Sequence, residues 1–459
     1  MPVRLDVLIE GHLGGHVEIR GANDASFRYD SGYLELPEPT PLSVRFPLRE
    51  EVFDSPEVAY WLQNLLPDDE DVIEDWCGTF GGDVACPITL LGTPVGVECA
   101  GAVQFSSPDR TAELLDAPGG LEPLSEVALW AGLQHLSEDS SFRFAAPYGD
   151  SGRSVAGMQP KDALTMTADG WAVPWGRRAT THVLKLDRRR WRHETLVEHV
   201  TMRSAAHVGM PTPPTHLLHG DGLDVIVVER YDRRAMEGAP GPLRIHQEDF
   251  CQALGLPPKC RNQGAINGAT VDRCAKILAD VVDADTGDHA LLADMVLYRW
   301  IAGDTDGHAK NISILMSGAE RALAPLYDAA SYLPHRRGAE AALPLAMWTG
   351  RPGRQRKLHS ADTPRSLHQV ARAFNFAPAT VAQRVESLAA VTPNAFEATI
   401  NTLTMAEQTT ADELNLAADV AARASRCAAI ANDLTTQIAA GESPPQTPPQ
   451  DLNGSVGPT

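Results

Sequence analysis

The chain has 459 residues, a length that predicts two or three domains. Its apolar content and its charged fraction of 22% are typical of a globular protein, and no apolar run is long enough to span a bilayer. The net charge of −21 argues against a protein that binds nucleic acid through its own electrostatic field. Because the first residues also lack the apolar core of a signal peptide, we expect a cytoplasmic protein without a membrane partner.

The first 110 residues are predicted to form a subdomain of their own. Apolar and polar residues alternate over residues 1–48, as in a small antiparallel sheet. The period changes to that of a helix from Ser55 to Leu66, and a strand-like run follows from Gly101 to Phe105. We place the boundary in the polar connection from Pro108 to Pro123.

Small residues are concentrated between Ser151 and Lys161. They allow backbone N–H groups to approach phosphate oxygens closely, so this segment could hold a nucleotide. Only Gly152 and Gly157 are glycines, however, and Pro160 lacks an N–H group. The segment alone therefore fits an ordinary hairpin as well as a phosphate-binding loop.

A lysine interrupts the apolar strand predicted from Thr181 to Leu186. Lys185 needs a partner if it is buried, because an ammonium group is costly to remove from water. A nucleotide phosphate is one such partner, whereas a lysine on an edge strand needs none. Glu194 and Glu198 follow on a stretch with helical spacing, and we expect Glu198 to pair with Lys185.

The next strand-like run, from Leu223 to Asp232, leads into a region that is predicted to be mainly helical. Backbone groups near Glu229 and the aromatic face of Tyr231 would suit a purine. Helices are then predicted over Asp249–Leu254, Val271–Val282, Asp288–Ile301, Pro364–Phe374, Pro378–Leu388 and Glu407–Ala440. The residues from Glu442 to Thr459 are rich in Pro, Gly and Ser and are predicted to be disordered.

The segment from Trp300 to Ile314 carries a high density of charged and polar residues. Within it, Asp306 and Asn311 stand five residues apart, which is the spacing of a phosphotransferase catalytic loop. In such a loop the aspartate accepts the proton of the substrate hydroxyl and the asparagine oxygen holds Mg²⁺. Asp328, at the end of a later apolar segment, would be a second ligand, because Mg²⁺ prefers hard oxygen donors.

Two other interpretations of this segment have to be weighed. An aspartate-rich connection between elements is often only a solvated turn. The run Asp304-Thr305-Asp306-Gly307 is also similar to the nucleophile loop of haloacid-dehalogenase-type phosphatases. That loop follows a buried β-strand, whereas the residues from Leu291 to Trp300 have helical spacing, with Asp288 as the predicted N-cap. The context therefore favours the phosphotransferase.

Taken in order, these pieces resemble the HipA-type serine/threonine kinases, the toxin half of bacterial toxin–antitoxin pairs. The resemblance covers residues 40 to 335 and rests on Leu65-Leu66-Pro67-Asp68, Glu98 to Phe105, Ser154 to Lys161, Thr181 to Leu186, Val228 to Asp232, His246 to Gly255, Asp304 to Asn311 and Leu326-Tyr327-Asp328. It implies an α+β, two-lobed protein-kinase-like fold, with β-sheets in the N-terminal lobe and a helical C-terminal lobe. The implied divisions are a HipA-type N-terminal subdomain over residues 1–110, a kinase N-lobe over 111–240, a helical C-lobe over 241–440 and a tail over 441–459.

The resemblance also implies roles for individual residues. Asp306 would be the catalytic base, and Asn311 and Asp328 would hold Mg²⁺. The residues expected to contact ATP are Ser154, Val155, Ala156, Gly157, Lys161, Lys185, Glu229, Tyr231 and His308. Ser154 would in addition be autophosphorylated, which would switch the enzyme off. Asp304 stands where such kinases commonly have Asn, so it would either add a carboxylate to the metal site or cap a turn.

The implied function is phosphorylation of a translation protein, with an aminoacyl-tRNA synthetase of the glutamyl type as the first expectation. The implied partner is a small helix-turn-helix antitoxin (HipB-like) that supplies most of the contact with DNA. The basic run from Arg351 to Lys357 is predicted to be an exposed loop or a contact for phosphate or nucleic acid. The alternative function is a largely non-catalytic co-repressor bound to such an antitoxin. A small-molecule kinase would share the Asp306 and Asn311 spacing but lacks support from the N-terminal motifs.

Overall fold

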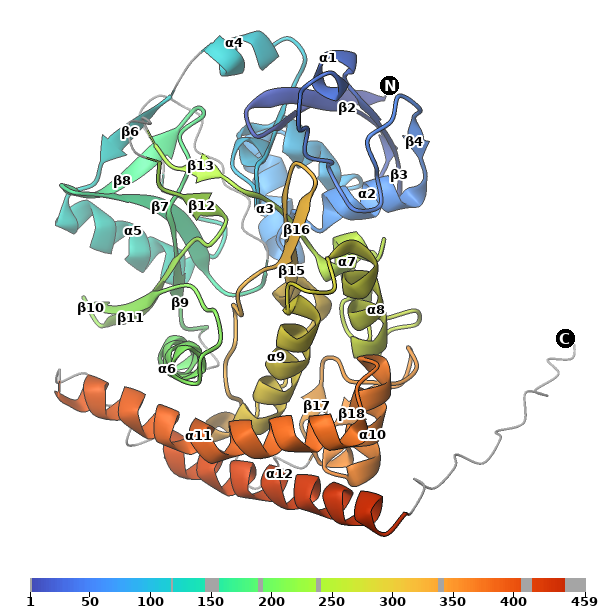
Figure 1. Cartoon of the computed structure of the whole chain (residues 1–459). Helices are drawn as coiled ribbons and strands as arrows, with labels where there is room; N and C mark the ends of the chain where they lie inside the picture. The colour runs from blue at the N-terminus through green and yellow to red at the C-terminus, as the bar shows by residue number, and fades with distance from the viewer. Residues whose placement is uncertain are drawn as a thin grey trace, which may run out of the picture.

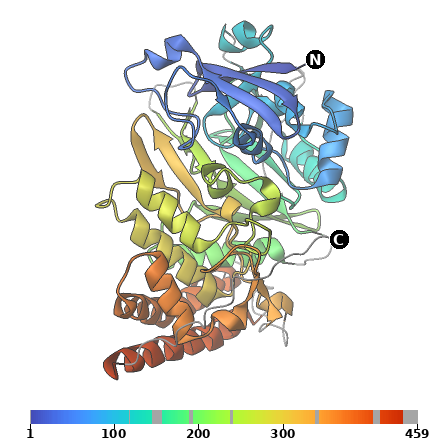
Figure 2. The ribbon, with the colours of Figure 1, turned by 90° about the vertical axis from the view of Figure 1, so that its right-hand side faces the viewer.

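The computed structural model describes residues 2–116, 119–144, 157–188, 193–236, 241–336, 342–405 and 415–441. The chain is α+β and two-lobed, with an additional N-terminal domain, and it has three separate apolar cores. In Figure 1 the N-terminal domain lies at the top, the sheet of the first lobe at the left and the helical lobe at the bottom. Figure 2 shows the same three layers from the side. None of the described helices combines the length and the apolarity that crossing a membrane requires.

The N-terminal domain is an antiparallel sheet covered by helices. The alternation of apolar residues places Leu5, Val7 and Ile9 on the buried face of the first strand, where Trp61 of α2 also packs. The strand order is β4-β3-β2-β1-β5, so a strand from the end of the domain closes the sheet beside the first one. The elements are β1 (Val3–Ile9), β2 (His12–Gly21), β3 (Asp24–Tyr29), α1 (Ser31–Leu34), β4 (Phe53–Asp54), α2 (Pro56–Gln63), α3 (Glu70–Phe80) and β5 (Val103–Ser106).

The first lobe contains a six-stranded antiparallel sheet in the order β10-β11-β9-β7-β8-β6. Helix α5 (Glu126–Glu138) covers one face, and its Leu129, Leu133 and Leu136 form a core with the strands. The strand that carries Lys185 is central, between β11 and β7, so that lysine does not lie on an edge strand. The other elements are α4 (Thr111–Asp116), β6 (Gly120–Pro123), β7 (Lys161–Thr167), β8 (Gly170–Trp175), β9 (His182–Leu186), β10 (Thr215–Gly220) and β11 (Leu223–Glu229).

The second lobe is mainly helical, as the sequence predicts, and its helices share one apolar core. Helix α6 (Glu194–His207) packs its apolar residues into this core. Helix α11 continues well beyond the expected end at Leu388, because Phe396 and Ile400 keep its buried face apolar and Pro393 is accommodated inside the helix. The N-cap before Asp288 is Gly287 rather than Asp288 itself. The elements are β12 (Arg233–Arg234), β13 (Leu243–Arg244), β14 (His246–Asp249), α7 (Phe250–Ala253), α8 (Val271–Val281), α9 (Asp288–Ala302), β15 (Ser313–Ser317), β16 (Glu320–Leu323), β17 (Pro344–Leu345), β18 (Arg356–Lys357), α10 (Pro364–Ala373), α11 (Pro378–Met405) and α12 (Leu416–Ala439).

The last described helix, α12, holds the end of α9. The buried Arg423 donates from Nε to the carbonyl oxygen of Trp300 at 2.7 Å and from Nη2 to Asp362 Oδ1 at 3.0 Å. The indole Nε1 of Trp300 donates to the same carboxylate at 3.0 Å. Since the Asp306 loop begins directly after α9, α12 helps to fix the point from which that loop departs.

A buried carboxyl group joins β14 of the helical lobe to the N-terminal domain. Glu248 is 1% exposed, accepts from the backbone N–H of Val44 at 2.8 Å and accepts from Trp61 Nε1 at 3.1 Å. Among the described residues it has no ion-pair partner, so burial raises its pKa from 4.5 to about 7. The folded protein therefore holds a proton on Glu248 at a pH where the unfolded chain has released it.

We expect this proton to make the folded state less stable as the pH rises from 5.5 to 7.5. The unfolded chain binds fewer protons in this window, so the free energy of unfolding falls by about 2 kcal/mol and then levels off above the folded pKa. Glu248→Gln should reduce this dependence of the melting temperature on pH, whereas Glu50→Gln, at an exposed site, should not. Equal slopes for the wild type and Glu248→Gln would show that Glu248 does not titrate in this range.

Candidate active site

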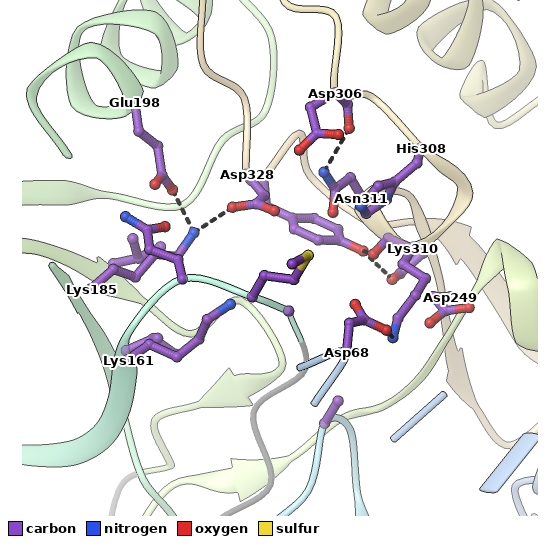
Figure 3. A pocket seen from close by; sticks show the side chains of 18 of the residues that line it. Asp68, Lys161, Lys185, Glu198, Asp249, Asp306, His308, Lys310, Asn311 and Asp328 are labelled. Atoms are coloured by element: carbon purple, nitrogen blue, oxygen red, sulfur yellow. Dashed lines mark hydrogen bonds and ion pairs between the residues drawn. The ribbon is translucent and has the colours of Figure 1, made fainter. Parts of the chain in front are cut away.

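One cavity of about 260 Å³ lies where the three cores meet (Figure 3). Leu65, Asp68 and Ala100 of the N-terminal domain line it, together with residues of both lobes. Most of the residues predicted to contact ATP or Mg²⁺ lie here, namely Gly157, Lys161, Lys185, Glu229, Tyr231, Asp306, His308, Asn311 and Asp328. The other three, Ser154, Val155 and Ala156, lie outside the described residues. The structure thus brings together residues that are distant in the sequence.

A buried ion triad occupies one side of the cavity. Lys185 Nζ on β9 lies 2.6 Å from Glu198 Oε1 on α6 and 2.5 Å from Asp328 Oδ1. Burial by itself would lower the pKa of Lys185, but the charges of Asp328 and Glu198 outweigh it and raise the pKa. Glu198 is thus the partner of Lys185, as expected, while Glu194 pairs with Arg188. The lysine is held in its charged form at a fixed position.

A second lysine lies beside the first, on the neighbouring strand of the sheet. Lys161 on β7 is the register partner of Lys185 on the adjacent antiparallel strand, and both are 7% exposed. Burial and the neighbouring Lys185 charge lower the pKa of Lys161 to about 8. Gly157, at φ +110°, lies so close that a Cβ atom there would come within 2.4 Å of Lys161 Nζ. Two adjacent buried ammonium groups favour an anion, and a phosphate chain fits this requirement.

The loop after α9 is fixed by an arginine and an aspartate. Gly303 ends the helix at φ +73°, and the next residue, Asp304, is 2% exposed and pairs with Arg299. Asp304 Oδ1 accepts from the backbone N–H of Asp306 at 3.0 Å, so it caps the turn and has no free oxygen directed at a metal. Arg299 also donates to the carbonyl oxygen of Tyr327 at 2.7 Å. One guanidinium group thus joins the Asp306 loop to the segment that carries Asp328.

Asp306 and Asn311 line the same cavity, on the side of Asp328 (Figure 3). Although Asp306 opens to the solvent of the cavity, the surrounding protein and the charges of Asp304 and Asp328 raise its pKa to about 7. Asn311 Nδ2 donates to the carbonyl oxygen of Asp306 at 3.0 Å, which leaves Oδ1 as the side-chain atom available to a cation. The preceding element is the helix α9, so the strand required for a phosphatase nucleophile loop is not there.

The donor set suits Mg²⁺ better than a metal held only by protein. Within the part of the chain that the structure describes, no group of three or more His, Cys, Asp or Glu side chains could hold a metal ion. Asn311 and Asp328 supply one amide and one carboxylate oxygen. Mg²⁺ is commonly bound by one or two carboxylates together with substrate phosphates, and the two lysines provide for such phosphates. The residues present therefore fit Mg²⁺ with a nucleotide.

The other end of the cavity is aromatic and apolar. Tyr231 follows β11, and its ring centroid lies 5.2 Å from that of Tyr327, with its hydroxyl donating to Gln247. Glu229 is exposed at the end of β11, and its backbone N–H is already bonded to the carbonyl oxygen of Pro214.

His308 lies on the Asp306 loop. Burial first, and then the charge of Arg261, lower its pKa to about 3, so its imidazole is neutral.

Sequence reasoning missed part of the site. Asp68 entered only as part of an N-terminal motif, yet it lines the cavity and forms ion pairs with Lys310 and Arg261. A lysine next to Asn311 in a buried loop does predict a carboxylate partner. Its identity could not be read from the sequence, because Asp68 and Lys310 are 242 positions apart.

The basic run from Arg351 to Lys357 lies outside this cavity. It forms the tip and second strand of the β17–β18 hairpin and is mostly exposed. None of its arginines or its lysine forms an ion pair with a carboxylate of the described residues. This confirms the expectation of an exposed loop and leaves a contact with nucleic acid as a prediction.

Family models match both parts of the chain. A HipA N-terminal domain matches residues 5–106, and a HipA-like C-terminal domain matches residues 153–396. A putative kinase, Y4mE of Sinorhizobium fredii, is 33% identical over 336 residues, which are 72% of this chain and 77% of the relative.

The chain belongs to the HipA family.

A second relative in the HipA family is the serine/threonine-protein kinase toxin HipA of Shewanella oneidensis, which is 27% identical over 63% of this chain and 66% of its own. A solved structure of the toxin–antitoxin system HipA, HipB and operator DNA from that organism contains a chain with the same fold. The TM-score is 0.76 at 22% identity, over 94% of this chain and 99% of the other. The two-lobed HipA kinase fold is thereby confirmed.

Proposed function

We propose that this protein is an ATP- and Mg²⁺-dependent serine/threonine protein kinase and the toxin of a toxin–antitoxin pair. The observation that carries the proposal is that the ion triad of Lys185, Glu198 and Asp328 lines the same cavity as Asp306 and Asn311. A two-lobed kinase needs this combination of a phosphate-binding lysine, its glutamate, a base and two oxygen ligands. Membership of the HipA family supports the same reaction.

The residues have separable tasks in this proposal. Asn311 and Asp328 would hold Mg²⁺, which would neutralise charge on the γ-phosphoryl group that bound ATP supplies. Lys185 and Lys161 would bind phosphate oxygens, with Glu198 keeping Lys185 in place. Asp306 would orient the hydroxyl of a serine or threonine and accept its proton. The apolar end near Tyr231 would take the adenine ring.

Autophosphorylation of Ser154 is proposed as the switch of this enzyme. Ser154 itself lies outside the described residues, but Gly157, three residues later, lies against Lys161. A phosphate on Ser154 would add a charge of about −1.5 to −2 close to the two lysines that ATP needs. Competition for these lysines would lower the affinity for ATP.

The proposed partner is a small helix-turn-helix antitoxin of the HipB type. It is supported by the complex in which the structural neighbour was solved. With a net charge of −21, this chain would leave most contact with DNA to that partner, and the hairpin tip from Arg351 to Lys357 is its candidate for a direct contact. The proposed substrate is a translation protein, first an aminoacyl-tRNA synthetase of the glutamyl type.

The test is transfer of labelled γ-phosphate from Mg·ATP by the purified protein, alone and in a cell extract. We expect label on Ser154 and on one extract protein, with the first lost in Ser154→Ala and both lost in Asp306→Gln. If neither protein is labelled although ATP binds, the catalytic proposal fails. The second candidate, a non-catalytic co-repressor on an antitoxin, would then remain, and it predicts tighter operator binding by the antitoxin when this protein is added.

A further inference from the structure

The N-terminal domain contacts the lobes on both sides of the cavity. On the side of the helical lobe, Asp68 follows α2 and reaches the loop that carries Asn311. On the side of the six-stranded sheet, Glu98 reaches the segments that flank β9 and β11. We call these two carboxylates the lobe bridge. Neither of them is used in the mechanism proposed above.

Asp68 is enclosed between two cations of the helical lobe. Its side chain is 5% exposed, and its oxygens lie 2.7 Å from Lys310 Nζ and 2.9 Å from Arg261 Nη1. Burial alone would raise the pKa of Asp68, but the charges of Lys310 and Arg261 outweigh it and lower the pKa. Figure 3 shows Asp68 and Lys310 directed at one another beside Asn311. The carboxyl group of Asp68 is therefore held in its ionised form inside the protein.

Lys310 transmits this contact to the Asp306 loop. It lies in the short helical turn Ala309–Asn311, and its carbonyl oxygen accepts from the hydroxyl of Tyr327 at 2.8 Å. Arg261 binds the same turn through its backbone, because its carbonyl oxygen accepts from the N–H of Ala309 at 3.2 Å. Asp68 thus holds the turn through Lys310 and through Arg261.

Glu98 contacts the first lobe through Thr180 and Arg230, and the strands that lead into the second lobe through Arg233 and Arg244. It is 4% exposed, and its Oε1 accepts from Thr180 Oγ1 at 2.6 Å, from Arg230 Nη1 at 3.0 Å and from Arg233 Nη2 at 2.8 Å. Arg244 pairs with its other oxygen. The charges of these arginines outweigh the effect of burial and lower the pKa of Glu98. Of these residues, Arg230 lines the cavity and directly precedes Tyr231, at the end of the cavity proposed for adenine.

We propose that the lobe bridge fixes the two kinase lobes relative to one another, and that Asp68 is a positioning residue for Asp306 and Asn311. The inference rests on the proposed kinase function. Kinase lobes move about their connection, and a third domain bonded to both lobes restricts this movement. A displacement of about 1 Å of a catalytic group can cost about 100-fold in rate. A small shift of the Asp306 loop after loss of the Asp68 contacts would therefore be measurable as slower transfer.

The experiment compares Asp68→Asn, Lys310→Met and the double variant, with Asp69→Asn as the matched control. Asp69 is the N-cap of α3, and Asn caps a helix as well as Asp does, so this control removes the same charge one residue away. The readouts are single-turnover transfer of labelled γ-phosphate from Mg·ATP, binding of a fluorescent ATP analogue, the melting temperature and deuterium exchange of residues 304–311.

For Asp68→Asn we expect a rate of transfer 10- to 100-fold lower, unchanged binding of the analogue and faster exchange in residues 304–311. A lone buried cation also lowers the melting temperature. The double variant has no unpaired charge on Lys310 but still lacks the carboxylate that pairs with Arg261, so its melting temperature should recover in part while its transfer stays slow. In the Lys310→Met background, the Asp68 change should have little further effect on transfer, because most of its effect passes through Lys310.

The outcomes distinguish a positioning role of Asp68 from a role in stability alone. If transfer recovers together with the melting temperature in the double variant, the pair only stabilises the fold and the inference is wrong. The inference is also wrong if Asp68→Asn transfers phosphate and exchanges deuterium like the wild type. A wild type that transfers no phosphate would refute the proposed kinase instead, and exchange in residues 304–311 would still report whether Asp68 positions the loop.

Discussion

Asp306→Asn should lower the rate of phosphoryl transfer by about 10²- to 10⁴-fold, the usual contribution of a general base. The substitution keeps the shape of the side chain and removes its ability to accept a proton. The loop should keep its conformation, because it is held by the backbone N–H of Asp306 on Asp304 and by Asn311 Nδ2 on the Asp306 carbonyl oxygen. The effect should therefore fall on the reaction and spare the binding of Mg·ATP.

The measurement is a single-turnover assay at saturating Mg·ATP together with a separate binding titration. Asp285→Asn, at an exposed position before α9, is the control for loss of one aspartate charge. A variant at Asp306 that binds Mg·ATP and transfers phosphate at the wild-type rate would remove this residue from the catalytic role. The Asp306→Asn rate also sets the background against which the Asp68 variants are read.

Asp328→Asn should raise the Mg²⁺ concentration required for half-maximal transfer by at least 10- to 100-fold, a loss that changes beside a metal site commonly cause. The backbone of Asp328 has a φ of +52°, and Asn adopts this left-handed conformation readily. The change therefore removes one charge without adding backbone strain. Lys185 keeps Glu198 as a partner, so the strand position of the lysine should be retained.

A titration of transfer against Mg²⁺ tests this prediction, with Asp328→Ala beside it. Alanine is poorly suited to a positive φ, so that variant should also melt at a lower temperature, whereas Asp328→Asn should melt close to the wild type. An unchanged Mg²⁺ requirement in Asp328→Asn would mean that Asn311 and other groups bind the metal without Asp328.

Local patterns predicted much of the fold and the catalytic set. The helical spacing before Asp304 identified α9, and the lysine in the Thr181 to Leu186 run predicted a strand with Glu198 as its partner, while the central position of that strand came from the structure. These signals work because the residues concerned lie within one or two neighbouring elements. The end of α11 was missed because Pro393 is a breaker by local rules, and burial of Phe396 overrides it.

Contacts between domains could not be predicted in this way. Nothing near Asp68 in the sequence indicates that it forms an ion pair with Lys310. The sequence around Glu98 likewise does not indicate which arginines pair with it. Both carboxylates are buried by contacts with residues far away in the sequence, Asp68 by Lys310 and Arg261 and Glu98 by Arg230, Arg233 and Arg244. The sequence likewise left open whether Asp304 binds the metal or caps a turn. In the structure Asp304 pairs with Arg299 and accepts from the backbone N–H of Asp306, so it caps the turn.

Because Arg423 anchors α9, the position at which the chain is truncated matters. The segment matched by the HipA-like C-terminal domain, residues 153–396, contains Lys185, Asp306 and Asp328 but ends before α12. A recombinant fragment, gene fusion or natural deletion that respects this boundary would retain those groups and lose the guanidinium that holds the Trp300 carbonyl oxygen. We therefore expect a chain that stops between residues 396 and 423 to lose the anchor of α9 although it keeps Lys185, Asp306 and Asp328.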